Sequence, residues 1–238
     1  MEQRGGGDFA TGSGANAPGP EKFFALRMRI SPLAPLARDF YLGLIGFTGG
    51  KGVAVGEPAV DLFTGAKGVS GLSYGLPGAA APCSLDYALS PLRGFSLLPS
   101  AEEAVRSFRE IARFLKPGGL FAFDLDNCCS PEKTGEGTMR VIGVARLPNG
   151  AEGVISESRS ALPGGRKTFC RLGVEELDGS GKVRCKSYHT LTLLTLSHKR
   201  VLELAKSAGF EAEGVFGSFK MEPFDSSSPT QLWLFRKL

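Results

Sequence analysis

The sequence lacks the features of a disulfide-linked, zinc-binding or membrane-spanning protein. It has five cysteines, an odd number, with no C-x-x-C pair and with two of them adjacent, which suits neither a disulfide framework nor a zinc site. No apolar run reaches the ~18 residues of a spanning helix, and the N-terminus has no basic-then-apolar secretory signal. We therefore expect reduced thiols, no bound metal and no membrane span.

A concentrated basic face is also missing. The formal net charge is +4, and the densest basic runs, residues 166–167 and 198–200, are not interleaved with aromatic residues. A nucleic-acid-binding surface needs clustered basic residues. Nucleic acid is therefore not expected among the partners. Reduced cysteines and the lack of a secretory signal make an intracellular, cytoplasmic location the expected one.

Glycine, by contrast, is abundant, and much of it lies before residue 80. Residues 1–20 contain six glycines and two prolines among small polar residues. Such a stretch buries too little apolar area to offset its ordering entropy, so we predict a flexible tail over 1–22 before a domain over 23–238. Basic residues between 22 and 38 leave a mitochondrial or plastid address open, whereas acidic residues before position 22 argue against a clean transit peptide.

The segment after the tail is apolar but is interrupted by prolines 32 and 35. It predicts one short helix around 37–44 or a strand at 41–47. Residues 48–82 are rich in glycine and show almost no helical periodicity, so the sequence predicts little regular structure there.

A strand–helix–strand unit follows. Residues 85–89 form a short apolar run, and Ser100 with Glu103 has the spacing of a helix capping box. Apolar residues recur at three and four positions until 115, and the K-P-G-G run at 116–119 then stops the helix. Residues 120–125 form the second apolar run. The unit predicts two parallel strands joined by a helical crossover.

The pattern changes to β segments between residues 139 and 196. There are four such segments, separated by three turn signals that lie at 148–150, 163–165 and 178–181. An antiparallel β-meander is therefore predicted. A capped helix from Ser197 to Gly209 and strands at 212–217 and 231–236 complete the chain.

The ordered set of segments resembles the class I S-adenosylmethionine (SAM)-dependent methyltransferases. The motifs are S-L-D-Y-A-L-S-P, similar to the family's fourth-strand F-D-x-V, L-K-P-G-G before an apolar strand, the helix L-S-H-K-R-V-L-E-L-A-K-S-A-G-F, and the terminal Q-L-W-L-F-R-K-L. The likeness covers about 150 residues, and the nearest subtype acts on small molecules and has an antiparallel insertion after its fifth strand. The resemblance implies an α/β fold: a Rossmann-like, seven-stranded, mostly parallel sheet with helices on both faces, plus the meander.

The resemblance also implies SAM at the carboxyl ends of the first strands. The family's site needs a glycine-rich turn after the first strand, where the backbone approaches the ligand closely. The candidate turn is 42–50, with Gly43, Gly46 and Gly49, although it lacks the family's leading carboxylate and has Phe47 where small residues are usual.

The site also needs an acid at the end of the second strand to bind the ribose hydroxyls. No carboxylate lies between Asp61 and Asp86. Two assignments of the family's second strand to this sequence, which we term registers, remain open. In one, V-A-V-G-E-P is the second strand and Glu57 is the ribose acid; in the other, G-V-S-G-L-S is that strand and Ser73 occupies the acid's position.

Loops after the fourth and fifth strands, together with the meander, would supply the remaining contacts. Candidate residues are, for cofactor binding, Ser90 and Leu92; for substrate binding, Phe95, Asn127 and Tyr188; and for catalysis, Asp126 and His189. Asp126 has two alternative roles: a base or amine-orienting group, or a solvated loop acid. His189 is either a base or a packed, hydrogen-bonded residue.

Two functions remain compatible with these patterns. One is an active SAM-dependent methyltransferase with a small-molecule acceptor. The other is a methyltransferase-like pseudoenzyme, retained as a structural or assembly subunit with protein partners. Two features favour the second function: the missing acids, and a segment before Asp86 that is short for a further strand and helix. The segments after residue 85 match the family in order and fit both functions.

Overall fold

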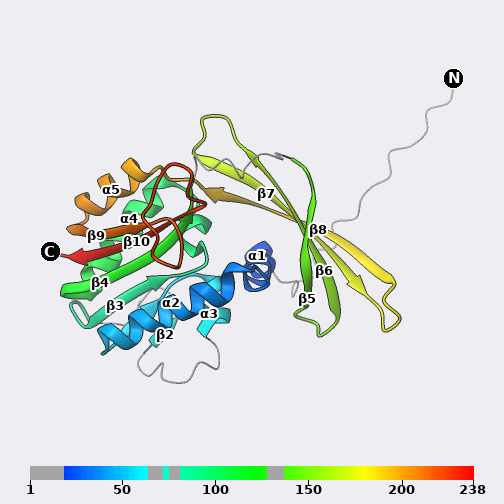
Figure 1. Ribbon diagram of the computed structural model, residues 1–238, viewed down its shortest axis with the longest axis horizontal. Helices are drawn as coiled ribbons and strands as arrows, with labels where there is room; N and C mark the ends of the chain where they lie inside the picture. Colours follow the sequence, from blue (N-terminus) through cyan, green and yellow to red (C-terminus); the bar gives the residue numbers. More distant parts are fainter. Residues whose placement is uncertain (1–18, 64–71, 75–80, 128–136) are drawn as a thin grey trace.

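The computed structural model describes residues 19–63, 72–74, 81–127 and 137–238. Within these ranges the strands form two sheets, one of six strands in the order β2-β1-β3-β4-β10-β9 and one of four strands in the order β5-β6-β7-β8 (Figure 1). The strands of the larger sheet are β1 (Gly52–Ala54), β2 (Leu72–Tyr74), β3 (Leu85–Ser90), β4 (Leu115–Asp126), β9 (Phe210–Phe216) and β10 (Thr230–Lys237).

The larger sheet is mostly parallel. β1 lies between β2 and β3 and is parallel to both, and β3 is parallel to β4. β10 is inserted between β4 and β9 and is antiparallel to both. The expected Rossmann-like, mostly parallel sheet is therefore confirmed, with six strands in the described ranges where the resemblance implies seven.

Helices cover both faces of this sheet (Figure 1). They are α1 (Pro20–Arg29), α2 (Leu33–Thr48), α3 (Glu57–Phe63), the 3-10 turn η1 (Gly94–Leu97), α4 (Ala101–Phe114) and α5 (His198–Ser207). Alternate residues of β4 point to opposite faces. Leu120 and Ala122 belong to a core with α1, α2 and α3, whereas Phe121 and Phe123 belong to a second core with α4 and α5.

Two serine caps begin the helices on the second face. Ser100 Oγ accepts a hydrogen bond from Glu103 N over 3.3 Å, and Ser197 Oγ accepts one from Arg200 N over 3.3 Å. Each cap satisfies a backbone donor that has no partner within the helix. Both predicted helix starts are confirmed.

The K-P-G-G run forms a bulge where α4 turns into β4. Leu85 pairs with Leu115, but the next pair is Tyr87 with Leu120, so the intervening residues loop out of the ladder. Gly118 has a φ of +74°, in the left-handed region that glycine favours. The predicted corner between helix and strand is confirmed.

The N-terminal part was predicted wrongly. Two helices, α1 and α2, occupy a region for which one short helix or a strand was expected. Pro20 is the first residue of α1, and Pro32 caps α2. Proline is tolerated at these positions because the first amides of a helix have no partner within it. α1 also begins inside the predicted 1–22 tail, of which residues 1–18 lie outside the described residues.

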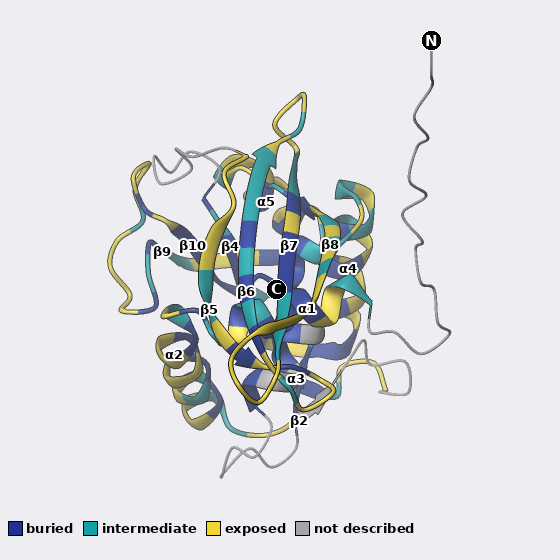
Figure 2. Cartoon of the chain, turned by 90° about the vertical axis from the view of Figure 1, so that its right-hand side faces the viewer, coloured by how far each residue is buried: buried dark blue, intermediate teal, exposed yellow. Residues whose placement is uncertain are grey.

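The predicted meander is confirmed as an antiparallel sheet. Its strands are β5 (Arg140–Arg146), β6 (Glu152–Ala161), β7 (Lys167–Leu177) and β8 (Val183–Leu194). Figure 2 looks onto this sheet and shows the middle of β7 buried and most of β5 exposed. No helix in the described ranges is long and apolar enough to cross a bilayer.

Candidate functional site

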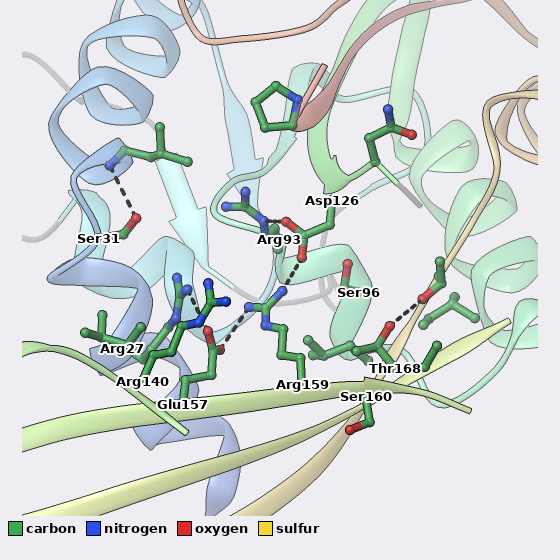
Figure 3. Close-up of a pocket in the computed structure, with 18 of the residues that line it drawn as sticks. Arg27, Ser31, Arg93, Ser96, Asp126, Arg140, Glu157, Arg159, Ser160 and Thr168 are labelled. Carbon is green, nitrogen blue, oxygen red and sulfur yellow. Dashed lines mark hydrogen bonds and ion pairs between the residues drawn. The ribbon is translucent and has the colours of Figure 1, made fainter. Parts of the chain in front are cut away.

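A cavity of about 450 Å³ lies between the carboxyl ends of β3 and β4 and the inner face of the meander (Figure 3). Arg93 and Ser96 come from the loop after β3, and Asp126 and Asn127 come from the end of β4. Residues of α1, α2 and the meander close the other sides. Pockets that hold small molecules have volumes of about 300 to 1,000 Å³, so this cavity is large enough for one.

Three arginines and two carboxylates form a continuous chain along the cavity, which we term the arginine ladder (Figure 3). Arg93 Nε donates to Asp126 Oδ1, and Arg159 Nη1 donates to Asp126 Oδ2. Arg159 Nη2 donates to Glu157 Oε1 over 3.0 Å, and Arg27 Nη2 donates to Glu157 Oε2 over 2.7 Å. Each carboxylate is therefore bridged by two guanidinium groups.

The fold brings the ladder together from distant segments. Arg27 lies on α1, while Glu157 and Arg159 lie two residues apart on β6 and therefore share one face of that strand. Gly153 and Ile155, also on this face, are buried. The buried face of β6 thus changes from small and apolar residues to charged ones as the strand enters the cavity.

The ladder carboxylates are held in their charged form. Burial alone would raise the pKa of Asp126, but the charges of Arg93 and Arg159 and their hydrogen bonds lower it well below its usual value. The pKa of Glu157 is also lowered, because Arg159 and Arg27 outweigh its burial. An ion-paired carboxylate of this kind is a poor general base, so Asp126 orients the arginines instead.

These pKa shifts predict acid sensitivity. A carboxylate with a lowered folded-state pKa stabilises the fold above its unfolded-state pKa, and that contribution is lost as the pH falls. The free energy of unfolding should therefore fall below about pH 4, and less steeply in Arg159→Gln than in the wild type. Urea unfolding between pH 3 and 7 measures this slope. The exposed Arg184→Gln serves as control, and identical slopes in the wild type and Arg159→Gln would contradict the role of the ladder.

A third carboxylate, Asp124, fixes the loop that carries Arg93. It is fully buried and accepts hydrogen bonds from Tyr41 Oη over 2.8 Å, Leu92 N over 2.8 Å and Arg93 N over 3.0 Å. Leu92 and Arg93 have φ values of 52° and 60°, in the left-handed region. That conformation costs roughly 1–2 kcal/mol per non-glycine residue, so Asp124 stabilises a strained turn that directs Arg93 into the cavity.

Comparison with known proteins supports a methyltransferase fold. The CcbJ methyltransferase of Streptomyces caelestis superposes with a TM-score of 0.63 at 17% identity, covering 87% of this chain and 90% of that one. SAM-bound CalS10 of Micromonospora echinaspora, an amino pentose methyltransferase, gives 0.62 at 14% identity, covering 90% and 95%. The chain has the class I SAM-dependent methyltransferase fold.

The sequence comparisons are more limited. Over an aligned segment of 139 residues, 58% of this chain, the sequence is 28% identical to the cypemycin N-terminal methyltransferase of a Streptomyces species. The match covers 52% of that relative, so the chain spans about half its length. No protein-family model matches the sequence.

Within the methyltransferase fold, the glycine-rich turn lies elsewhere than predicted. Gly43 and Gly46 are inside α2, and Gly49 is its C-terminal cap, so a turn at 42–50 is wrong. The first strand of the parallel sheet is β1, and Gly56 follows it with a φ of +98°. Because this strand is only three residues long, periodicity could not reveal it.

The first of the two ribose-acid registers is also wrong. Glu57 begins α3 directly after the first strand, so it does not end the second strand. Ser73 lies in β2 and pairs with Val53 of β1, as the other register requires. The second strand therefore has a serine, and no carboxylate, in this segment.

The helical position of Gly43 predicts how its replacement affects stability. Gly43 lies in the interior of α2, and a Cβ there would meet no atom within 4 Å. Gly43→Ala should therefore stabilise the protein by about 0.5–1 kcal/mol, because alanine loses less backbone entropy in a helix. Denaturant unfolding measures the change, and a destabilised variant would show that Gly43 is needed for another reason.

Of the predicted catalytic and substrate residues, Asp126 and Asn127 line the cavity. Asn127 Nδ2 donates to the carbonyls of Ser226 over 3.1 Å and Ser228 over 2.8 Å, which holds the end of β4 to the loop before β10. Asn127 is therefore anchored at the rim of the site.

The other candidates are not among the residues that line the cavity. Ser90 and Leu92 are buried next to it, in the β3 end and its loop. Phe95 is a core residue, with its ring centroid 4.9 Å from that of Phe123. Tyr188 is 57% exposed. Phe95 and Tyr188 are therefore not substrate contacts in this cavity.

His189 is a packed residue. Its ring stacks on Phe23 at 3.9 Å between centroids, and Nε2 lies 3.1 Å from Ser187 Oγ. Burial lowers the pKa of His189. These contacts match the packed, hydrogen-bonded alternative, and His189 is not among the residues that line the cavity.

Proposed function

We propose that the chain is a SAM-dependent methyltransferase that acts on a small molecule. The observation that carries this proposal is the cavity at the carboxyl ends of β3 and β4, which the meander covers. In open α/β sheets, ligands bind at the carboxyl ends of the strands. The cavity provides a place for an acceptor next to the edge at which proteins of this fold place the cofactor.

The residues at that edge fit SAM through their backbone. A Cβ on Gly56 would lie 3.2 Å from Gly94 Cα, so the turn after β1 is shaped for a residue without a side chain. Ser90 Oγ is buried and has no hydrogen-bond partner among the described residues. Gly56 and Ser90 would hold the cofactor's amino-acid end, where backbone and hydroxyl groups are the available partners.

The ribose end would be held more weakly. The register assigns Ser73 to that position in β2, and a serine hydroxyl forms one neutral hydrogen bond where a carboxylate forms two charge-assisted ones. We therefore expect the affinity for SAM to be lower than that of a site with the carboxylate.

Bound SAM supplies an electrophilic methyl group on its sulfonium. The chain contributes orientation and exclusion of water: Asp124 fixes the loop after β3, the arginine ladder makes the cavity wall rigid, and the meander covers it. Holding two reactants in a near-attack geometry is itself a large catalytic effect. Because Asp126 is a poor base, an acceptor whose nucleophile is already deprotonated suits this cavity best.

A neutral amine meets that requirement. CalS10 is described as an amino pentose methyltransferase, and the cypemycin enzyme as an N-terminal methyltransferase. We therefore propose nitrogen as the methylated atom. An amine can lose its proton to bulk water before it enters the cavity, so no histidine or carboxylate has to accept one.

One observation favours a second candidate function. The second strand carries no carboxylate, and between Asp61 and Asp86 the sequence offers none. A methyltransferase-like pseudoenzyme, serving as a structural or assembly subunit, would not need that group. This alternative retains the fold and loses the cofactor.

Isothermal titration with SAM and with its demethylated product separates the two functions. Saturable binding in the micromolar range would support the enzyme. An absence of heat at millimolar ligand would reject it and leave the pseudoenzyme. Gly56→Val should abolish the binding, whereas Gly43→Ala, the matched control in α2, should leave it unchanged.

A further inference from the structure

The arginine ladder has more donors than its carboxylates can accept. All four carboxylate oxygens of Asp126 and Glu157 are engaged by guanidinium groups. Arg93 Nη1, Arg27 Nε and Arg159 Nε nevertheless have no partner among the described residues. Arg93 is only 5% exposed and lines the cavity. Unsatisfied buried donors are costly, so the ladder is arranged for an additional acceptor.

The charges of the ladder do not cancel. Among the described residues of the ladder, three guanidinium groups face two carboxylates, which leaves one positive charge. The nearby carboxylates raise the pKa of Arg159 against the effect of its burial. The excess charge therefore persists at any ordinary pH. A partly buried cation without a matching anion is unfavourable, and a bound anion would neutralise it.

We propose that the ladder arginines bind an anionic group, a carboxylate or phosphate, on the methyl acceptor. This inference rests on the proposed function and specifies its substrate class: a small amine that also carries an acid group. The guanidinium fork suits carboxylate and phosphate oxygens, since it offers parallel N–H donors. Anchoring the acid at the ladder would leave the amine end of the molecule free to face the carboxyl edge of β1 and β3.

Simple anions can probe this site in the full chain. Benzoate, the isosteric neutral benzamide and inorganic phosphate would be titrated while the arginine Nε–H signals are followed by NMR. We expect saturable shifts of ladder signals with benzoate or phosphate and none with benzamide. Equal responses to benzoate and benzamide, or no saturable response to either anion, would overturn the proposal.

Arg159→Gln tests the contribution of the central arginine. The substitution leaves Asp126 paired with Arg93 and Glu157 paired with Arg27, so each carboxylate keeps a cation. Benzoate affinity should fall roughly tenfold or more, because a charge-assisted contact is lost. Arg159→Lys keeps the charge and should retain part of the affinity. The exposed Arg184→Gln should bind as the wild type does, and unchanged affinity in Arg159→Gln would contradict the assignment. If Arg159→Gln unfolds, the benzoate–benzamide comparison in the wild type decides.

The demethylated cofactor product distinguishes the acceptor's acid from the cofactor's own carboxylate. Benzoate that still binds when the chain is saturated with this product would support an acceptor site. Competitive displacement of benzoate by the product would overturn it, because the ladder would then hold the cofactor. Anion binding without any SAM binding would reject the proposed function but keep the anion site, so the two failures are distinguishable.

Discussion

Replacing Asp124 with alanine is expected to destabilise the protein by about 3 kcal/mol or more. The substitution leaves three buried donors without a partner: Tyr41 Oη and the amides of Leu92 and Arg93. Each unsatisfied buried group costs about 1–3 kcal/mol. The two amides also belong to left-handed residues, so the loop that carries Arg93 loses the contacts that hold it. Denaturant unfolding measures the loss.

Tyr41→Phe is the matched control for this prediction. It removes one of the three donors and keeps the aromatic ring in the core, so Asp124 retains both amide partners. We expect a loss of about 1 kcal/mol, the net contribution of one hydrogen bond. If Asp124→Ala is no less stable than Tyr41→Phe, the backbone contacts of Asp124 do not stabilise the loop.

Replacing Gly119 with valine should be the most damaging change at the corner between α4 and β4. A Cβ at this position would lie 2.9 Å from the carbonyl oxygen of Lys116 and 3.2 Å from that of Asp86. Both are backbone atoms, so no side chain can move to relieve the overlap. Overpacking of this kind costs about 1–3 kcal/mol, and for a chain of this size each kcal/mol lowers the melting temperature by about 2–4 °C. Thermal unfolding should show the shift.

Gly118 provides the contrast. A Cβ there would meet no atom within 4 Å, but the residue has a φ of +74°. Gly118→Asn should cost little, because asparagine tolerates the left-handed conformation, whereas Gly118→Val should lower the stability by roughly 1–2 kcal/mol. A Gly119→Val variant as stable as Gly118→Asn would show that the corner can rearrange around the added side chain.

The back half of the fold could be predicted because its signals are local. The Ser100 cap lies three residues from its partner, and the K-P-G-G corner is contiguous in sequence. Each turn of the meander also contains its own glycine with a positive φ, such as Gly150 and Gly181. Local signals of this kind need no knowledge of which distant segments pair.

The front half could not be predicted because its signals were ambiguous or short. Pro32 and Pro35 were interpreted as interruptions, although a helix accepts proline in its first turn. β1 and β2 are three residues long, too short to show a period. Only the sheet order identifies β1 as the first strand and so moves the glycine turn from 42–50 to Gly56.

The site was predicted in part for the same reason. Asp126 and Asn127 follow a recognisable strand, and both line the cavity. The arginine ladder was missed because its members lie far apart in sequence; Arg27 and Glu157, for example, are 130 positions apart. One signal was present: Glu157 and Arg159 continue the alternating inner face of a β strand, where charged residues are unusual unless they are paired.

A crystal structure of the chain with the demethylated cofactor product would show whether the cofactor binds at the carboxyl edge of the parallel sheet. We predict that the ligand lies along the carboxyl ends of β1 and β3, against Gly56 and Ser90, with its sulfur facing the cavity that Asp126 lines. A ligand bound elsewhere, or a β1–β3 edge without bound ligand at a saturating concentration, would contradict this prediction.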